Sequence, residues 1–207
     1  MGQTIEHPYS IKTRPRDIYV RDDALGSVDN AIKTIIITID RFTDRVGILI
    51  SWLAVPLVAV VMFEVVSRYA FNAPTLFAFD MTYMLYGALF MLGAGPALLR
   101  GAHIRTDFFW DKFSPKTQGW IDLISYLVFF FPSFGLLFLV GLEEAVYAYT
   151  INETSDQTPW RPLLWPFKFT LPIACSVVLL QGISECLKSW IKAKSGLEVV
   201  QHEKVEV

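Results

Sequence analysis

Apolar residues in this chain are concentrated in four blocks, each long enough to cross a lipid bilayer. The blocks cover approximately residues 46–67, 81–99, 120–142 and 169–187. A spanning helix needs about 20 mostly apolar residues, because the hydrocarbon core is about 30 Å thick and each residue rises about 1.5 Å. Lipid offers no hydrogen-bond partners, so a spanning backbone must pair within its own segment. The pattern predicts an all-α integral membrane protein with four transmembrane helices.

A different pattern precedes the first block. Between residues 27 and 45 apolar side chains recur at spacings of three and four, which predicts an amphipathic helix with Ser27 as its N-cap. We expect this helix to lie in the membrane plane, with its apolar stripe in the headgroup region or against a partner. The alternative is a helix folded back on the cytoplasmic loop of the same chain. Gly47 is expected to supply the bend into the first span. The stripe consists of Val28, Ile32, Ile35, Ile39, Phe42 and Val46.

The remaining segments are short and polar. Residues 1–26 show no periodicity and are expected to form a disordered cytoplasmic tail, and residues 191–207 a second cytoplasmic tail. Residues 46–190 then form a four-helix transmembrane domain. No short apolar segment with a small-residue cleavage site precedes residue 46, so the first span is expected to remain uncleaved.

The basic residues predict the orientation of the chain. Of its 18 Lys and Arg residues, fifteen lie before the first block, between the second and third blocks, or after the fourth. Lys and Arg in short loops favour the cytoplasmic side of a membrane. The loop between the third and fourth blocks is instead rich in Asp and Glu, which suits an external face. Both termini are therefore predicted to be cytoplasmic.

Composition argues against several kinds of chemistry. The mean hydropathy is +0.41, and the only histidines, His7, His103 and His202, lie outside the interiors of the predicted spans. A haem-binding helical bundle needs axial ligands inside the bundle. No HExxH, CxxC, GxSxG or P-loop motif occurs. Cys175 and Cys186 lie about 16 Å apart along one predicted helix, too far apart for a disulfide. We expect no catalytic residue, metal ligand or cofactor site.

Few ionisable residues lie within the spans, where a charge costs at least about 2.5–3.5 kcal/mol at the bilayer centre. Glu64 precedes Arg68 by one helical turn, so the two side chains can face each other. Asp80 enters the second span at the same outer level, and we expect a Glu64–Arg68–Asp80 network that ties the first hairpin together. Gln181 and Glu185 share one face of the fourth span, and Glu185 is expected to extend to the inner interface.

Two loop motifs carry a family resemblance. The first span is followed by RYAFNAPTLFAFD at residues 68–80, and the second by RGAHIRTD at residues 100–107. This arrangement resembles the small permease subunit of tripartite ATP-independent periplasmic (TRAP) transporters, the DctQ-like family, over about residues 28–192. Thr106 stands where that family commonly has Val, and Asp80 where it more often has Glu.

The resemblance implies a non-enzymatic scaffold subunit in the inner membrane of a bacterium. Its partners would be a large multi-span permease subunit that carries substrate and sodium, and a periplasmic substrate-binding protein that delivers a solute, often an organic acid. The subunit would be in contact with membrane lipid and would not bind nucleic acid. The resemblance assigns structural or subunit-interface roles, and no substrate contact, to Arg68, Asn72, Asp80, Arg100, Gly101, His103, Arg105 and Asp107. Glu64 is a candidate for the same kind of role because of its spacing to Arg68.

Three alternatives follow from the residues alone. The chain could be a small four-span subunit of a redox or other energy-converting complex, although the lack of intramembrane histidine disfavours haem. It could be a lipid-modifying enzyme, for which the His103–Asp107 group is the only candidate and lacks a nucleophile. It could also be a self-sufficient transporter or channel, which the scarcity of charge within the spans disfavours.

Overall fold

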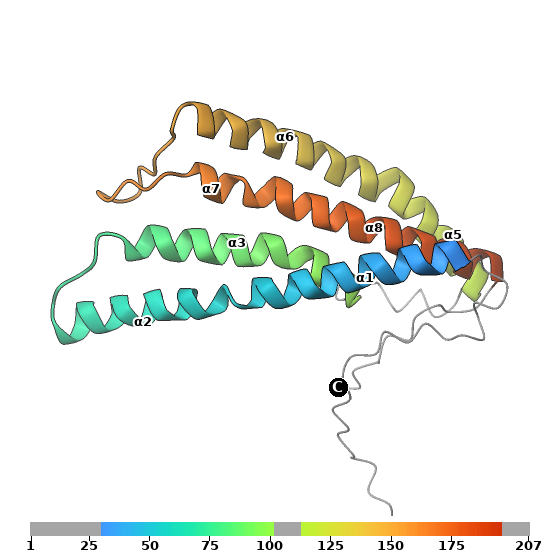
Figure 1. The fold of residues 1–207 in the computed structure, drawn as a ribbon, viewed down its shortest axis with the longest axis horizontal. Coiled ribbons are helices and arrows are strands. Elements are labelled where there is room, and N and C mark those ends of the chain that lie inside the picture. The colour runs from blue at the N-terminus through green and yellow to red at the C-terminus, as the bar shows by residue number, and fades with distance from the viewer. Residues whose placement is uncertain (1–29, 102–112, 196–207) are drawn as a thin grey trace, which may run out of the picture.

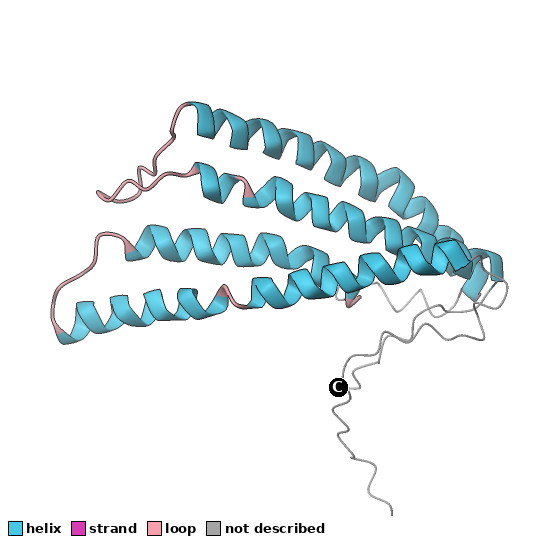
Figure 2. Ribbon diagram, in the orientation of Figure 1, coloured by secondary structure: helices cyan, strands magenta, loops and turns pink. Residues whose placement is uncertain are grey.

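The computed structural model describes residues 30–101 and 113–195, and every regular element within them is a helix (Figures 1 and 2). His103, Arg105 and Asp107 lie outside the described residues. The helices are α1 (Asn30–Ser51), α2 (Ala54–Ala70), α3 (Ala78–Leu99), α5 (Pro115–Ser125), the π-helical turn η2 (Tyr126–Phe130), α6 (Phe131–Thr150), α7 (Trp165–Lys168) and α8 (Thr170–Ser195).

These helices join into four stretches that are long and apolar enough to cross a membrane. They are Ala31–Ala70, Ala78–Leu99, Pro115–Thr150 and Trp165–Lys194. The predicted all-α fold with four candidate spans is confirmed. The first stretch has 40 residues, which is about 60 Å of helix and about twice the thickness of the hydrocarbon core. The helices therefore extend well beyond the apolar blocks in the sequence.

The four stretches form a layer in which α8 is central. Figure 1, viewed along the shortest dimension of the molecule, shows α2, α3, α8 and α6 side by side in that order. The packing agrees, since α8 contacts α3 and α6, and α2 packs chiefly on α3. At the other end of the molecule α1 and α5 also pack against α8. Much apolar surface remains exposed. In the stretch Pro115–Thr150 none of the most apolar segment is buried, whereas in the stretch Trp165–Lys194 half of the corresponding segment is buried.

The chain interrupts its first helix at Trp52 and Leu53, not at Gly47. Pro56 has no N–H to donate to the carbonyl of Trp52, and the Val55 N–H bonds that carbonyl instead, at 3.2 Å. Figure 1 shows α1 continuing the line of α2 across this break. Gly47 lies within α1, where an added Cβ would be 3.0 Å from Cβ of Pro96. The predicted role of Gly47 was wrong: it allows α3 to approach α1 closely.

A second proline shapes the third stretch. Pro132 cannot donate a hydrogen bond to the carbonyl of Val128, and just before it the helix widens into η2, in which the Phe131 N–H bonds the carbonyl of Tyr126. The ring of Phe130 in this turn covers Gly182 of α8, where an added Cβ would lie 2.3 Å from the ring. The π-helical turn thus packs an aromatic ring directly on the backbone of α8.

Candidate functional sites at the two ends of the layer

Glu64 stabilises the C-terminal end of α2. The Arg68 guanidinium donates to Oε1 of Glu64 through Nε at 2.9 Å and through Nη2 at 2.5 Å. The backbone N–H of Thr75 donates to Oε2 of Glu64 at 3.1 Å, and the Thr75 hydroxyl also bonds this oxygen. The predicted Glu64–Arg68 pair is confirmed. Its wider effect is to fasten the α2–α3 loop to the last turns of α2.

Asn72 reverses the chain after α2. Its φ of 51° lies in the left-handed region, which Asn tolerates better than most residues. On either side of it the Ala73 N–H bonds the carbonyl of Ser67 at 3.0 Å, and the Ser67 hydroxyl donates to the carbonyl of Ala73 at 2.5 Å. Asn72 therefore shapes the turn through its backbone, whereas Glu64 fastens the turn through its side chain.

The structure corrects the predicted role of Asp80. This carboxylate is 1% exposed and accepts hydrogen bonds from the Ser155 hydroxyl, at 2.6 Å, and from the Thr158 hydroxyl. It therefore binds the loop between α6 and α7 and does not join Arg68. Asp80 shares a face of α3 with Gly87 and Gly95, which contact Phe167 and Val177 in the last stretch of the chain. That face points away from α2, so Asp80 cannot complete the predicted network.

Loss of Asp80 should loosen this loop. We expect Asp80→Ala to lower the unfolding free energy by about 1–2 kcal/mol, since two hydroxyl groups lose their acceptor and the loop loses its anchor. Tryptophan fluorescence during unfolding in mixed micelles measures the loss, and limited proteolysis between residues 151 and 164 locates it. Asp156→Ala removes an acid from the same loop that is 78% exposed, and it should change neither readout.

Further contacts join residues 71–77 and 151–164, the two loops predicted to face outward, into a unit that we call the outer cap. The Phe77 ring lies 6.1 Å from that of Phe63 and 6.2 Å from that of Trp160. Lys168 of α7 donates to Glu153 at 2.6 Å and lies 3.5 Å from Glu144 of α6. All four stretches thus meet at the outer cap.

A buried polar cluster joins α1 to α8 toward the end of the layer opposite the outer cap. Asp40 of α1 accepts hydrogen bonds from Gln181, at 3.0 Å, and from Ser184, at 2.7 Å. Lys188 lies 2.8 Å from a carboxylate oxygen of Asp40 and also 2.8 Å from Glu185. Asp40, Gln181 and Ser184 are at most 1% exposed, and Glu185 and Lys188 at most 8%. The Glu185 side chain does not extend out of the protein as predicted, because Lys188 compensates its charge within the cluster.

The cluster holds more acceptors than donors. Two carboxylates share one ammonium group, and Oε1 of Gln181 accepts no hydrogen bond from the residues that the structure describes. The Thr43 hydroxyl, fully buried one turn after Asp40, likewise has no described partner. Buried ionic groups of this kind fix the register of two helices, and each depends strongly on its partners.

The predicted apolar stripe of α1 coincides only in part with the face that packs on the rest of the chain, where Ile39 is buried and Ile32 lies against Ile36 and Ile191. Of the predicted stripe, Ile35 and Phe42 are 46% and 48% exposed. The buried face is rotated by about one residue and includes polar Asp40 and Thr43, while Ile36 packs on Ile191 of α8. A search for periodic apolar residues misses this face, because some of its buried positions are polar. The placement of this helix in the membrane plane stays a prediction.

Arg100 and Gly101 end α3 near α1. Arg100 lies 3.9 Å from Asp44 of α1, and both side chains are partly exposed. Gly101 has a φ of 65°, and its N–H bonds the carbonyl of Leu98 at 3.1 Å. The expectation that Gly101 permits the turn is confirmed, because a left-handed residue after a helix is most easily a glycine.

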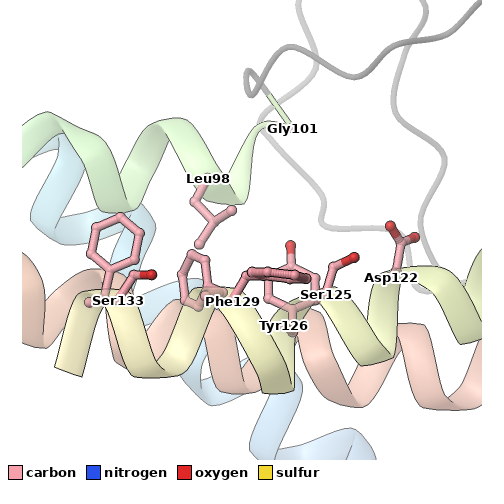
Figure 3. Close-up of a pocket in the computed structure, with 9 residues that line it drawn as sticks. Leu98, Gly101, Asp122, Ser125, Tyr126, Phe129 and Ser133 are labelled. Carbon is pink, nitrogen blue, oxygen red and sulfur yellow. The ribbon is translucent and has the colours of Figure 1, made fainter. Parts of the chain in front are cut away.

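A cavity of about 410 Å³ opens beside this turn, between α3 and the segment containing η2 (Figure 3). Its polar wall includes Asp122, Ser125 and Ser133, and its apolar wall includes Leu98 and Phe129. In the part of the chain covered by the structure, no group of three or more His, Cys, Asp or Glu residues could hold a metal ion.

Comparison with known proteins gives one family match. The model of the family described as tripartite ATP-independent periplasmic transporters, DctQ component, matches residues 57–192, which is 136 of the 207 residues. The match begins in α2 and ends in α8, and it includes both loop motifs. No curated protein and no solved structure matched.

Proposed function

We propose that this chain, which belongs to the DctQ component family of tripartite ATP-independent periplasmic transporters, is the scaffold subunit of a sodium-coupled organic acid importer. It would bind a large multi-span permease subunit that moves substrate and sodium, and a periplasmic binding protein would deliver the substrate. Both termini would lie in the cytoplasm, and the outer cap would face the periplasm. Enzymatic activity is not part of this role.

One observation carries the proposal: the four spans form a layer with large apolar faces and no charged residue in its middle. A carrier of ions or organic anions needs polar groups at membrane depth. A layer that leaves its apolar faces open is instead suited to packing against another membrane protein. Segments without Asp, Glu, Lys, Arg or His cover residues 46–63, 81–99, 123–142 and 169–184.

These uncharged segments are 18, 19, 20 and 16 residues long, or about 24–30 Å of helix, which fits one bilayer core. The polar contacts of the layer therefore lie at the two ends of these uncharged segments. Glu64 and Asp80 are at the outer boundary, while Asp44, Arg100 and Glu185 are at or beyond the inner boundary. Ion pairs and hydrogen bonds therefore rigidify the layer at both surfaces, as a static scaffold requires.

Purification of the tagged chain from its native membrane in mild detergent, with mass spectrometry of the associated proteins, tests the proposal. We expect a large multi-span permease in equal amount. Recovery of the chain alone, or with redox subunits, would contradict the scaffold role. The redox alternative has no support from the fold.

Arg68→Ala should reduce the amount of assembled complex several-fold and leave substrate affinity of the transporter unchanged. The substitution frees Glu64 and loosens the first hairpin, and small losses of stability lower abundance in cells. Quantitative pull-down and substrate binding by the purified complex measure the two effects. Arg161→Ala, which removes an exposed Arg of the outer loop, is the control and should assemble normally.

The second loop motif predicts for Asp107→Ala the same loss of assembled complex as for Arg68→Ala. Normal assembly with a tenfold change in substrate affinity would refute the scaffold assignment.

A further inference from the structure

We infer that a cavity under the outer cap receives a basic side chain of the periplasmic binding protein, an inference that rests on the proposed function. The cavity has a volume of about 410 Å³ and lies between α3, the loop 151–164 and α7. Its polar wall includes Glu153, Asp156 and Lys168, and its aromatic wall includes Phe79, Tyr83 and Phe167.

The walls of this cavity are held in place before any partner arrives. Asp80 anchors Ser155 to α3, and a backbone bridge joins Thr154 to Leu163 across the loop. The Leu164 N–H also bonds the carbonyl of Glu153 at 2.8 Å. A site that is rigid in the free protein loses little conformational entropy when a side chain enters it.

The charge around the cavity favours a cation. Glu153 and Asp156 outnumber Lys168, the one basic residue in the lining. The Lys168 ammonium is already held by Glu153 at 2.6 Å and lies 3.5 Å from Glu144, so its charge is largely compensated. Among the described residues Asp156 forms an ion pair with Arg161 alone, and both of these side chains are more than half exposed. An exposed pair of this kind is weak and can exchange partners readily.

The aromatic wall favours the same kind of ligand. The rings of Tyr83 and Phe167 lie 5.1 Å apart, and Phe79 and Tyr83 are 61% and 52% exposed. Ammonium and guanidinium groups bind to aromatic faces. An organic anion would meet excess negative charge here, so the cavity is unsuited to a carboxylate substrate.

Affinity measurements on the assembled transporter test the inference. The complex of this chain with its large subunit, in nanodiscs, is titrated with the purified binding protein of the same transporter at low salt. Glu153→Gln should raise the Kd about tenfold, and Asp156→Asn several-fold, because each removes a charge that faces the incoming cation. Both differences should shrink as salt concentration rises. Lys168→Gln should leave the Kd unchanged or lower it.

Glu143→Gln is the matched control, since Glu143 is an exposed acid of α6 that does not line the cavity. It should bind like the parent chain. Asp156→Asn preserves the bond between Lys168 and Glu153, so it tests the inference even if Glu153→Gln disturbs the loop.

Three results would overturn the inference. The first is unchanged or tighter binding by both acid variants, and the second is weaker binding by Lys168→Gln with tighter binding by Glu153→Gln, which indicates an anion. The third is that Glu153→Gln binds the binding protein with unchanged Kd but loses an amine-headgroup lipid that native mass spectrometry detects on the parent complex. That result would indicate that the cavity holds a lipid headgroup. Failure to assemble with a large subunit would instead contradict the proposed function.

Discussion

Replacing Lys188 with alanine is expected to lower the unfolding free energy by about 3–5 kcal/mol, the largest effect that we expect from a single substitution in this chain. Lys188 is 7% exposed and lies 2.8 Å from carboxylate oxygens of both Asp40 and Glu185. Its loss removes the basic partner that the structure gives to these two buried carboxylates. Gln181 and Ser184, the other described donors to Asp40, are neutral and cannot replace that charge.

Unfolding in mixed micelles, followed by tryptophan fluorescence, measures this loss. The double variant Lys188→Met with Asp40→Asn should lose less stability than the two single variants together, because each single variant leaves the partner charge buried alone. Glu143→Ala is the control, since Glu143 is an exposed acid of α6 outside the cluster. If Lys188→Ala cost no more than Glu143→Ala, the cluster would not hold α1 against α8.

Gly119→Leu should separate α5 from α8 and cost about 3 kcal/mol or more. An added Cβ at Gly119 would lie 2.4 Å from the backbone N of Ala193 and 2.9 Å from the carbonyl oxygen of Ser189. These atoms belong to the backbone of α8 and cannot rotate away as a side chain could. The higher helix propensity of Leu, worth less than about 1 kcal/mol, is too small to offset the clash.

Gly135→Leu is the matched control, because an added Cβ at this glycine of α6 meets no atom of another described segment within 4 Å. The same substitution should there leave stability unchanged or raise it slightly. Thermal unfolding of the two variants in the same detergent makes the comparison. Equal melting temperatures would show that α5 and α8 pack less closely than the structure describes.

The sequence by itself determined the features that depend on neighbours along the chain. The length of the apolar blocks predicted four spans, because bilayer thickness sets the length of a spanning helix. The Glu64–Arg68 pair followed from a spacing of four residues, and the turn at Gly101 from the conformational freedom of glycine. The loop motifs predicted the family, which the match over residues 57–192 confirms.

The tertiary structure decided every feature that joins residues distant in the chain. Asp80 bonds Ser155, 75 residues away, and Asp40 bonds Gln181, 141 residues away. Periodicity shows that a helix has an apolar side, but it does not distinguish a side that faces lipid from a side that packs on a neighbouring helix. A buried polar side chain such as Asp40 breaks the apolar pattern, and its partner can be found only once α1 and α8 are placed together. The order of helices in the layer likewise depends on close backbone contacts, such as Gly119 against Ala193, that no local pattern encodes.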